Sequence, residues 1–169
     1  MKKKTFKNTL AVALLSCAAL GASVAHAASQ SYTINLTATV PAHTFQVDPA
    51  DSGWITQTQT MEFDATSRTL KPFEKQFKYK STAGAIQAKL TGSLAMGQAM
   101  ITGSNGFVIP LTVKFNNTDL TNTTTTVVTA AAAKTGGTAT LHIAPASSTE
   151  LTEGTYTGSV AMIFEPVVD

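Results

Sequence analysis

The sequence predicts an all-β protein, a sandwich of two sheets, and three features support that prediction. Threonine and valine are abundant, and apolar and polar residues alternate along much of the chain. Segments with this alternation recur roughly every dozen residues and are separated by turn-forming residues, as the strands of a sandwich are. Helical periodicity extends over no segment longer than about ten residues.

The first expected strand covers residues 31–40, ahead of the rest of the domain. Alternate side chains of an extended chain point to opposite faces, so its apolar residues share one face. A strand of this kind needs a sheet to join, either its own or that of a neighbouring molecule. Pro41, followed by Ala42, is the predicted hinge behind it. The apolar face consists of Tyr32, Ile34, Leu36, Ala38 and Val40.

Eight further strands are expected. In residues 107–115 the side chains of Phe107, Ile109, Leu111, Val113 and Phe115 should face inward. Proline donates no backbone hydrogen bond, so Pro110 places this strand at a sheet edge or at a local break. The alanine run 130–133 fits a short helix, a loop or a strand end. The candidate strands are residues 43–47, 58–63, 73–79, 85–91, 107–115, 124–129, 138–144 and 156–164.

The strand that closes the chain has the same alternating character as the first. It is predicted to run without interruption to Phe164. Its shared apolar face consists of Tyr156, Val160, Met162 and Phe164, with Gly158 in register.

Residues 1–27 have the layout of a secretory signal peptide: four lysines, an apolar run over 10–24, and Ala25-His26-Ala27 before the predicted cleavage point. A membrane-spanning helix is the less favoured interpretation, because polar residues and a glycine interrupt the run. Cys17, preceded by a loosely lipobox-like sequence, leaves a lipoprotein signal as a further alternative.

Cleavage after Ala27 would leave 142 residues, enough for one domain, with no cysteine and a net charge of −2. An exported chain without disulfides must be stabilised by packing, hydrogen bonds or a partner chain. The basic character of the whole chain therefore belongs to the signal, and nothing suggests nucleic-acid binding. Lys71, Lys75, Lys78 and Lys80 are interpreted as a solvated face.

Residues for catalysis or metal binding are scarce. Behind the signal there are two histidines, His43 and His142, and no nucleophile-elbow motif, which argues against a hydrolase and predicts no cofactor. A surface or structural role is expected for both histidines. The carboxylates of Asp48 and Asp51 lack the spacing of a calcium loop, although a weak calcium site there stays open.

Trp54 is the single tryptophan. If buried, it would fill the sandwich or meet a neighbouring subunit, which is the preferred interpretation; if exposed, it could stack on a sugar ring.

Four segments carry a resemblance to a known family. They are the alternating strand 33–40 closing with Pro41, residues 45–48 before a turn, residues 109–115 followed by Asn116-Asn117, and the ending 153–160. In these segments the chain resembles the major pilins of the alpha-type chaperone-usher fimbriae, the family of colonisation-factor and cable-pilus subunits. Trp54 and the tail 166–169 have no place in this pattern.

The resemblance implies an immunoglobulin-like sandwich that lacks its final strand, with residues 28–41 as a donor strand and 42–169 as the incomplete domain. A periplasmic chaperone would fill the gap first. The donor residues Tyr32 to Val40 of the next copy would then replace it at an outer-membrane usher, beside the acceptor strand that ends at Phe164. The expected product is a surface fimbria that supports adhesion and ends in a tip adhesin.

Two alternatives stand beside a major pilin: a monomeric secreted binding module, with carbohydrate bound through Trp54, and a minor or tip fimbrial subunit.

Overall fold

The computed structural model describes residues 30–40, 43–147 and 151–168 of the 169-residue chain. The predicted signal peptide, Cys17, and the hinge residues Pro41 and Ala42 lie outside the described residues. The chain divides into two units, Met1–Ala38 and Thr39–Asp169, and each is considered by itself.

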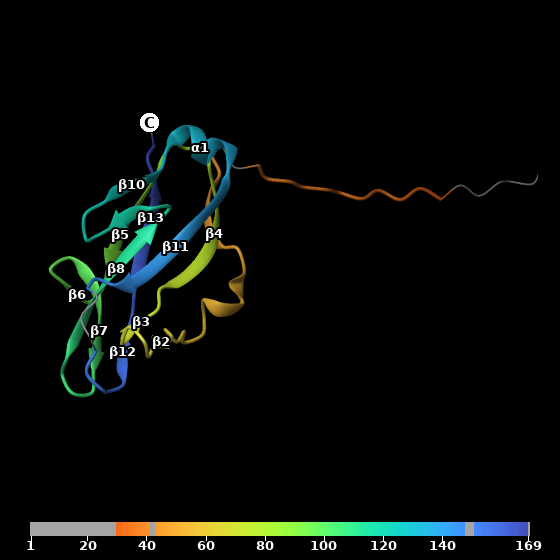
Figure 1. Cartoon of the computed structure of the whole chain (residues 1–169). Coiled ribbons are helices and arrows are strands. Elements are labelled where there is room, and N and C mark those ends of the chain that lie inside the picture. The colour runs from red at the N-terminus through yellow and green to blue at the C-terminus, as the bar shows by residue number, and fades with distance from the viewer. Residues whose placement is uncertain (1–29, 41–42, 148–150, 169) are drawn as a thin grey trace, which may run out of the picture. The chain divides into compact units, whose positions relative to one another are not determined.

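The second unit is built almost entirely from antiparallel strands (Figure 1). This confirms the all-β prediction. The strands are β1 Phe45–Pro49, β2 Phe63–Asp64, β3 Thr69–Leu70, β4 Phe73–Ser81, β5 Ile86–Thr91, β6 Leu94–Ala95, β7 Gln98–Gly103, β8 Val108–Phe115, β9 Thr118–Leu120, β10 Thr125–Val128, β11 Gly137–Pro145, β12 Tyr156–Gly158 and β13 Ala161–Pro166. Two short helices, 3-10 helix η1 Ser52–Trp54 and α1 Ala130–Thr135, complete the described elements.

The strands form a large and a small sheet with the core between them. The eight-stranded sheet has the order β1-β4-β11-β8-β7-β12, with β6 paired to β7 and β9 to β8. The three-stranded sheet has the order β10-β5-β13, and β2 and β3 form a separate hairpin. Phe77 and Phe115 of the large sheet contact Phe164 of the small one, so the two sheets face each other across the core.

Strand β8 supplies the centre of the core. Ile109, Leu111, Val113 and Phe115 are all at most 4% exposed, as their alternation predicts. The prediction that Phe107 faces inward is wrong, because β8 begins one residue later and Phe107 is exposed. Its carbonyl instead accepts a hydrogen bond from the Gly103 amide and closes the β7–β8 turn.

Pro110 does not mark a sheet edge, because β8 lies between β11 and β7. The carbonyl of Pro110 accepts from the amide of Ala146, and β11 ends at Pro145. The nitrogen of Pro110, which has no hydrogen to donate, therefore lies where the β8–β11 ladder ends. No ladder hydrogen bond is lost there, so an interior strand can contain this proline.

The closing strand is interrupted, contrary to the prediction of one continuous strand. Its first part, β12, pairs with β7, whereas β13 pairs with β5 in the other sheet. The chain thus changes sheets at residues 159–160. Gly158 makes the close approach to β7 possible, because a Cβ there would overlap the carbonyl oxygen of Met100 and lie 2.9 Å from Cγ2 of Ile101.

Local turn chemistry accounts for other boundaries. Asn116 and Asn117, with φ of 51° and 62°, form the two-residue turn between β8 and β9, the conformation of a type I′ hairpin that asparagine tolerates. The alanine run becomes helix α1, with Thr129 as its N-cap. The predicted strand 58–63 is wrong except at its last residue, and strands β3, β6, β7 and β9 were not predicted.

Candidate functional site

Residues 30–40 carry an apolar face that nothing described covers. No strand is formed in this segment, and it is drawn out as an extended trace (Figure 1). Ala38 is also exposed. The exposed fractions are 84% for Tyr32, 79% for Ile34, 89% for Leu36 and 87% for Val40. Such a contiguous set of exposed apolar side chains is typical of an interaction segment.

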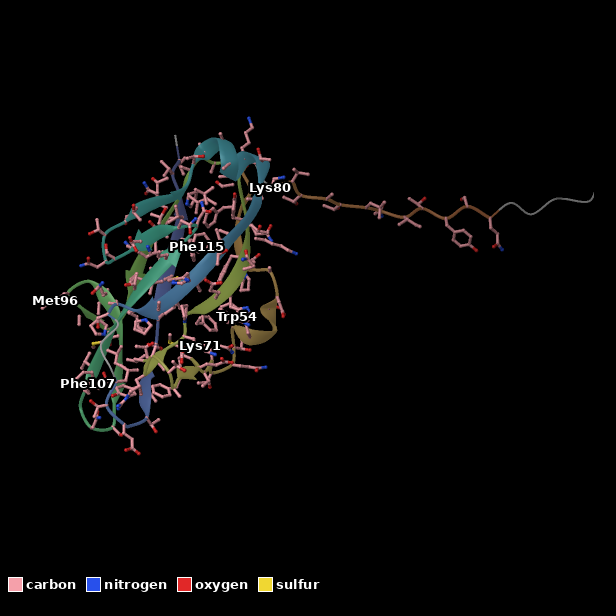
Figure 2. All side chains as sticks on the ribbon, viewed as in Figure 1. Trp54, Lys71, Lys80, Met96, Phe107 and Phe115 are labelled. Carbon is pink, nitrogen blue, oxygen red and sulfur yellow. The ribbon has the colours of Figure 1, made fainter. Side chains whose placement is uncertain are left out.

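The closing strand carries the second feature of the site. Tyr156, Val160, Met162 and Phe164 are all half-buried and pack against the core, so the predicted shared face survives the change of sheets. The ring centroid of Phe164 lies 4.7 Å from that of Phe115 and 6.3 Å from that of Phe77. Figure 2 marks Phe115 at the centre of this part of the molecule.

Strand β13 has one open edge. Among the described strands it pairs only with β5, and the Val167 amide donates to the Ala85 carbonyl at the end of that ladder. In an antiparallel ladder, alternate residues direct their peptide groups to opposite sides. The peptide groups of Met162 and Phe164 therefore point away from β5. Strand β1, at the edge of the large sheet, likewise pairs with a single described strand, β4.

Trp54 packs against the core rather than standing free. Its ring makes edge contacts with Phe73, at 5.7 Å between centroids, and with Phe77, at 6.0 Å. Figure 2 shows it beside β4. The structure therefore supports the interpretation of Trp54 as a packing residue over that of an open sugar platform.

The prediction that Lys71, Lys75, Lys78 and Lys80 form one solvated face is wrong for Lys75. It lies on the core-facing side of β4, between Phe73 and Phe77 in the alternation, and is half-buried. Its Nζ lies 5.7 Å from the ring centroids of both Trp54 and Phe73, a cation–π arrangement. Lys78 and Lys80 are exposed, as expected.

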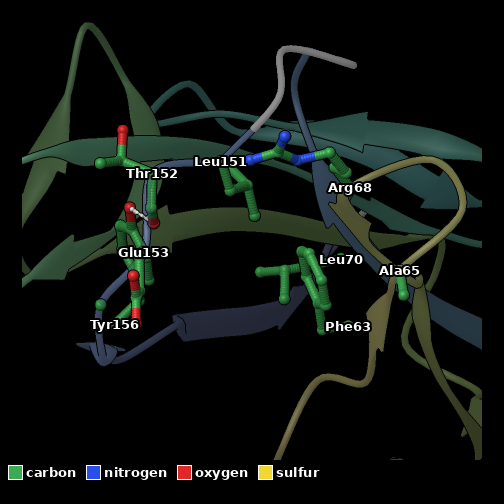
Figure 3. A pocket seen from close by; sticks show the side chains of 9 residues that line it. Phe63, Ala65, Arg68, Leu70, Leu151, Thr152, Glu153 and Tyr156 are labelled. Atoms are coloured by element: carbon green, nitrogen blue, oxygen red, sulfur yellow. Dashed lines mark hydrogen bonds between the residues drawn. The ribbon is translucent and has the colours of Figure 1, made fainter.

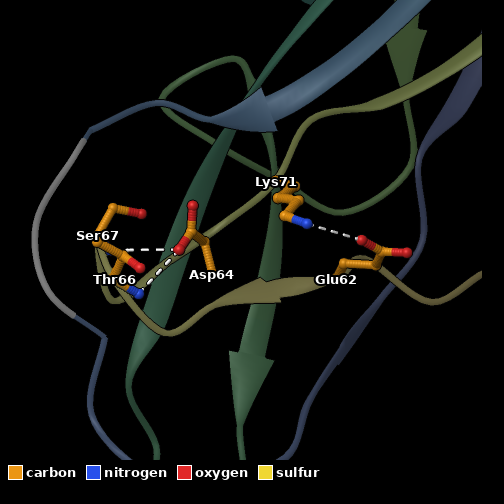
Figure 4. Close-up of polar contacts among 5 residues, drawn as sticks. All are labelled: Glu62, Asp64, Thr66, Ser67 and Lys71. Carbon is orange, nitrogen blue, oxygen red and sulfur yellow. Dashed lines mark hydrogen bonds and ion pairs between the residues drawn. The ribbon is translucent and has the colours of Figure 1, made fainter.

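A polar cluster on the β2–β3 hairpin is shown in Figure 4. Lys71 Nζ lies 3.1 Å from Glu62 Oε2, and this hydrogen bond raises the pKa of Lys71. The Asp64 carboxylate accepts from the amides of Thr66, at 2.8 Å, and Ser67, at 3.4 Å, and these bonds lower the pKa of Asp64. The cluster stabilises the turn between β2 and β3.

Among the remaining candidate residues, His142, Asp48 and Asp51 have hydrogen-bond partners. His142 Nδ1 lies 2.8 Å from Glu74 Oε1, on the face of β11 opposite the buried Leu141 and Ile143. His43 is exposed. Asp48 accepts from the Gln46 side chain and Asp51 caps η1. Within the described ranges, no group of three or more histidine, cysteine, aspartate or glutamate side chains could hold a metal ion.

Sequence reasoning missed a half-open cavity of about 470 Å³, shown in Figure 3. It lies between the β2–β3 hairpin and residues 151–156. The Leu151 amide donates to the Arg68 carbonyl and the Tyr156 hydroxyl to the Thr152 carbonyl, and these bonds hold its walls. Its walls come from segments far apart in the chain, so no local pattern could reveal it. Its lining includes the side chains of Phe63, Leu70, Leu151 and Tyr156.

The antiparallel β-sandwich described above is the fold of the pilin class. Residues 30–165 match the family model of the CS1 type fimbrial major subunit, and the chain belongs to that family. It is a major subunit of a surface fimbria, a structural protein rather than an enzyme, and it polymerises with copies of itself.

A solved structure agrees with this fold. The CooA pilin subunit from enterotoxigenic Escherichia coli superposes with a TM-score of 0.57 at 17% sequence identity, over 72% of this chain and 86% of that one. No curated protein matches the sequence. Across the described part of the chain, no helix has the length and apolar character needed to cross a membrane.

Proposed function

We propose that this fimbrial subunit polymerises by donor-strand complementation, in which residues 28–41 of one copy complete the sandwich of the next. The observation that carries the proposal is the open edge of β13, behind which Met162 and Phe164 are only half-buried. An exposed strand edge is a template for an added strand from another chain.

The donor segment suits that edge in chemistry and period. Its apolar residues recur at every second position, which is the period needed to place them all against one core face. Burying a large aliphatic side chain stabilises a complex by about 1.5 to 3 kcal/mol, so Ile34, Leu36, Val40 and part of Tyr32 would supply roughly 5 to 10 kcal/mol. Backbone hydrogen bonds along the added strand would come in addition.

The same proposal includes the assembly route. Residues 1–27 direct export to the periplasm, a chaperone covers the acceptor edge there, and an outer-membrane usher exchanges it for the donor segment of the next copy. The shortness of the hinge at Pro41 and Ala42 keeps the segment from folding back into its own domain, so linkage is head-to-tail and open-ended. A tip adhesin completes the fimbria, which supports adhesion.

One matched pair of variants tests the donor assignment. Leu36→Asn places an amide on the apolar face, and Thr37→Asn places the same amide on the opposite face. Leu36→Asn should abolish detergent-resistant multimers and surface fimbriae, whereas Thr37→Asn should leave both intact. Normal fimbriae from Leu36→Asn would overturn the proposal, as would a mature chain that is a stable, fully folded monomer by size exclusion without a chaperone.

Cysteine pairing tests the acceptor assignment directly. The proposed mature chain is free of cysteine, so introduced thiols give unambiguous cross-links. Cysteines at one donor position, Ala38, and at one β13 position, Met162 or Phe164, should yield a ladder of covalent multimers on non-reducing gels. The control carries the second cysteine at Lys114 instead, on the outer face of the large sheet. A ladder from the control alone would contradict the assignment of β13.

A further inference from the structure

The β7–β8 turn contains Asn105-Gly106, the one place in the sequence where glycine follows asparagine. Asparagine is chemically labile, and a following glycine removes the side chain that would hinder ring closure. We propose that Asn105 is a deamidation site of this chain, that the hydrogen bonds of the folded turn hold the reaction back, and that it proceeds when residues 153–155 detach from the turn.

The reaction needs only water. The Gly106 backbone nitrogen attacks Cγ of Asn105, an N–C bond forms, the bond from Cγ to Nδ2 breaks, and ammonia leaves with the amide proton. Water then opens the succinimide at either carbonyl and gives aspartate or isoaspartate. No atom is oxidised or reduced.

In the folded turn, hydrogen bonds hold both groups that would react, the Gly106 amide and the Asn105 side chain. The Gly106 amide donates to the Gly103 carbonyl at 2.9 Å, so the attacking nitrogen is hydrogen-bonded. The Asn105 side chain is fixed from both ends: Oδ1 accepts from the Phe107 amide at 2.9 Å, and Nδ2 donates to the Glu153 carbonyl at 3.1 Å. Ring closure would require breaking these bonds together.

Two of the contacts join the turn to the segment that precedes β12. Besides the bond from Asn105 Nδ2 to Glu153, the Ser104 amide donates to the Thr155 carbonyl at 3.0 Å. The bond from the Tyr156 hydroxyl to the Thr152 carbonyl, at 2.7 Å, holds the same segment from its other side. Detachment of residues 153–155 would free the Asn105 carboxamide to rotate.

The product would not restore the lost contact. An aspartate at position 105 has no donor for the Glu153 carbonyl and places a negative charge beside it. Deamidation would therefore remove one of the two hydrogen bonds that join the turn to this segment and would favour its detachment in the affected copy.

The experiment follows deamidation at Asn105 by peptide mass spectrometry in assembled fimbriae held in mildly alkaline buffer. The same chain unfolded in guanidinium and a synthetic peptide of residues 103–107 give the unprotected rate. Local opening limits the reaction, so the folded rate should be at least about tenfold lower than both. Asn116 and Asn122, which lack a following glycine, are internal controls and should stay slower than Asn105 in the unfolded chain.

The variant Tyr156→Phe tests the link to the detached segment without touching Asn105. It should accelerate deamidation at Asn105 severalfold in assembled fimbriae and leave Asn116 and Asn122 unchanged. Equal deamidation rates in the folded and unfolded chain would show that the folded turn does not protect Asn105. An unchanged rate in Tyr156→Phe would overturn the role of residues 153–155. Faster deamidation at another asparagine of the unfolded chain would overturn the assignment of Asn105 as the site. A Gly106→Ala peptide should react more slowly than its parent.

Discussion

The ring of Phe164 lies 4.7 Å from that of Phe115, centroid to centroid, and joins the last strand to the centre of the large sheet. Phe115 is fully buried, whereas Phe164 is only half-buried. The contact therefore anchors β13 from behind while its other edge stays open, which is the arrangement that an added strand requires.

Phe164→Ala should destabilise the subunit by about 2 to 3 kcal/mol, somewhat less than for a fully buried phenylalanine. The loss comes from the contacts with Phe115 and Phe77. Denaturant unfolding measures it on the subunit fused at its C-terminus to a second copy of residues 28–41, which supplies the added strand. The neighbouring Ile163→Ala, on the exposed face of β13, should change stability by less than about 1 kcal/mol. Equal effects of the two changes would contradict the described register.

Gly158→Ala should destabilise β12 by about 1 to 3 kcal/mol, because the added methyl group would overlap the Met100 carbonyl of β7. Hydrogen exchange should show faster exchange of the β12 and β7 amides. Ser159→Ala, at the exposed crossing between the sheets, is the control. Unchanged protection in Gly158→Ala would show that the two strands are farther apart than described.

Lys75→Met should leave stability unchanged or raise the unfolding midpoint. The side chain packs beside Trp54 and Phe73 on the core-facing side of β4, and methionine keeps the apolar contacts without a half-buried charge. Lys78→Met, on the exposed face of the same strand, should be neutral. Strong destabilisation by Lys75→Met alone would mean that the ammonium group makes an essential contact.

Asp64→Asn should change the pH dependence of stability at the acid end. Hydrogen bonds from Thr66 and Ser67 lower the pKa of the Asp64 carboxyl from 3.8, so its folded pKa is below its unfolded pKa. The contribution of Asp64 to the free energy of unfolding is fully present above its pKa in the unfolded chain. It is lost as the pH falls through its pKa in the folded protein. Midpoints of the variant and the parent should therefore converge as the pH drops below about 4. A constant difference across that range would refute this assignment.

Much of the fold could be predicted from residue order, since the alternation of side chains along a strand is a local property. For this reason the inward-facing residues of β8, apart from Phe107, and those of the closing strand were predicted correctly. The exposed apolar face of residues 30–40 also follows from alternation, and its role as the donor strand stays a prediction.

The pairing partner of each strand, in contrast, depends on residues that are distant in sequence. Only the tertiary structure decided which strands pair. The division of the closing strand between two sheets depends on the space that Gly158 leaves at β7. Pro110 is tolerated in an interior strand because the neighbouring strand ends beside it. Lys75 shares a face with Phe73 and Phe77 by alternation, but its contact with the Trp54 ring is decided by tertiary packing. The sequence by itself determined which residues face the same way, whereas three-dimensional packing determined what each face meets, because burial free energy depends on contacts that local order does not specify.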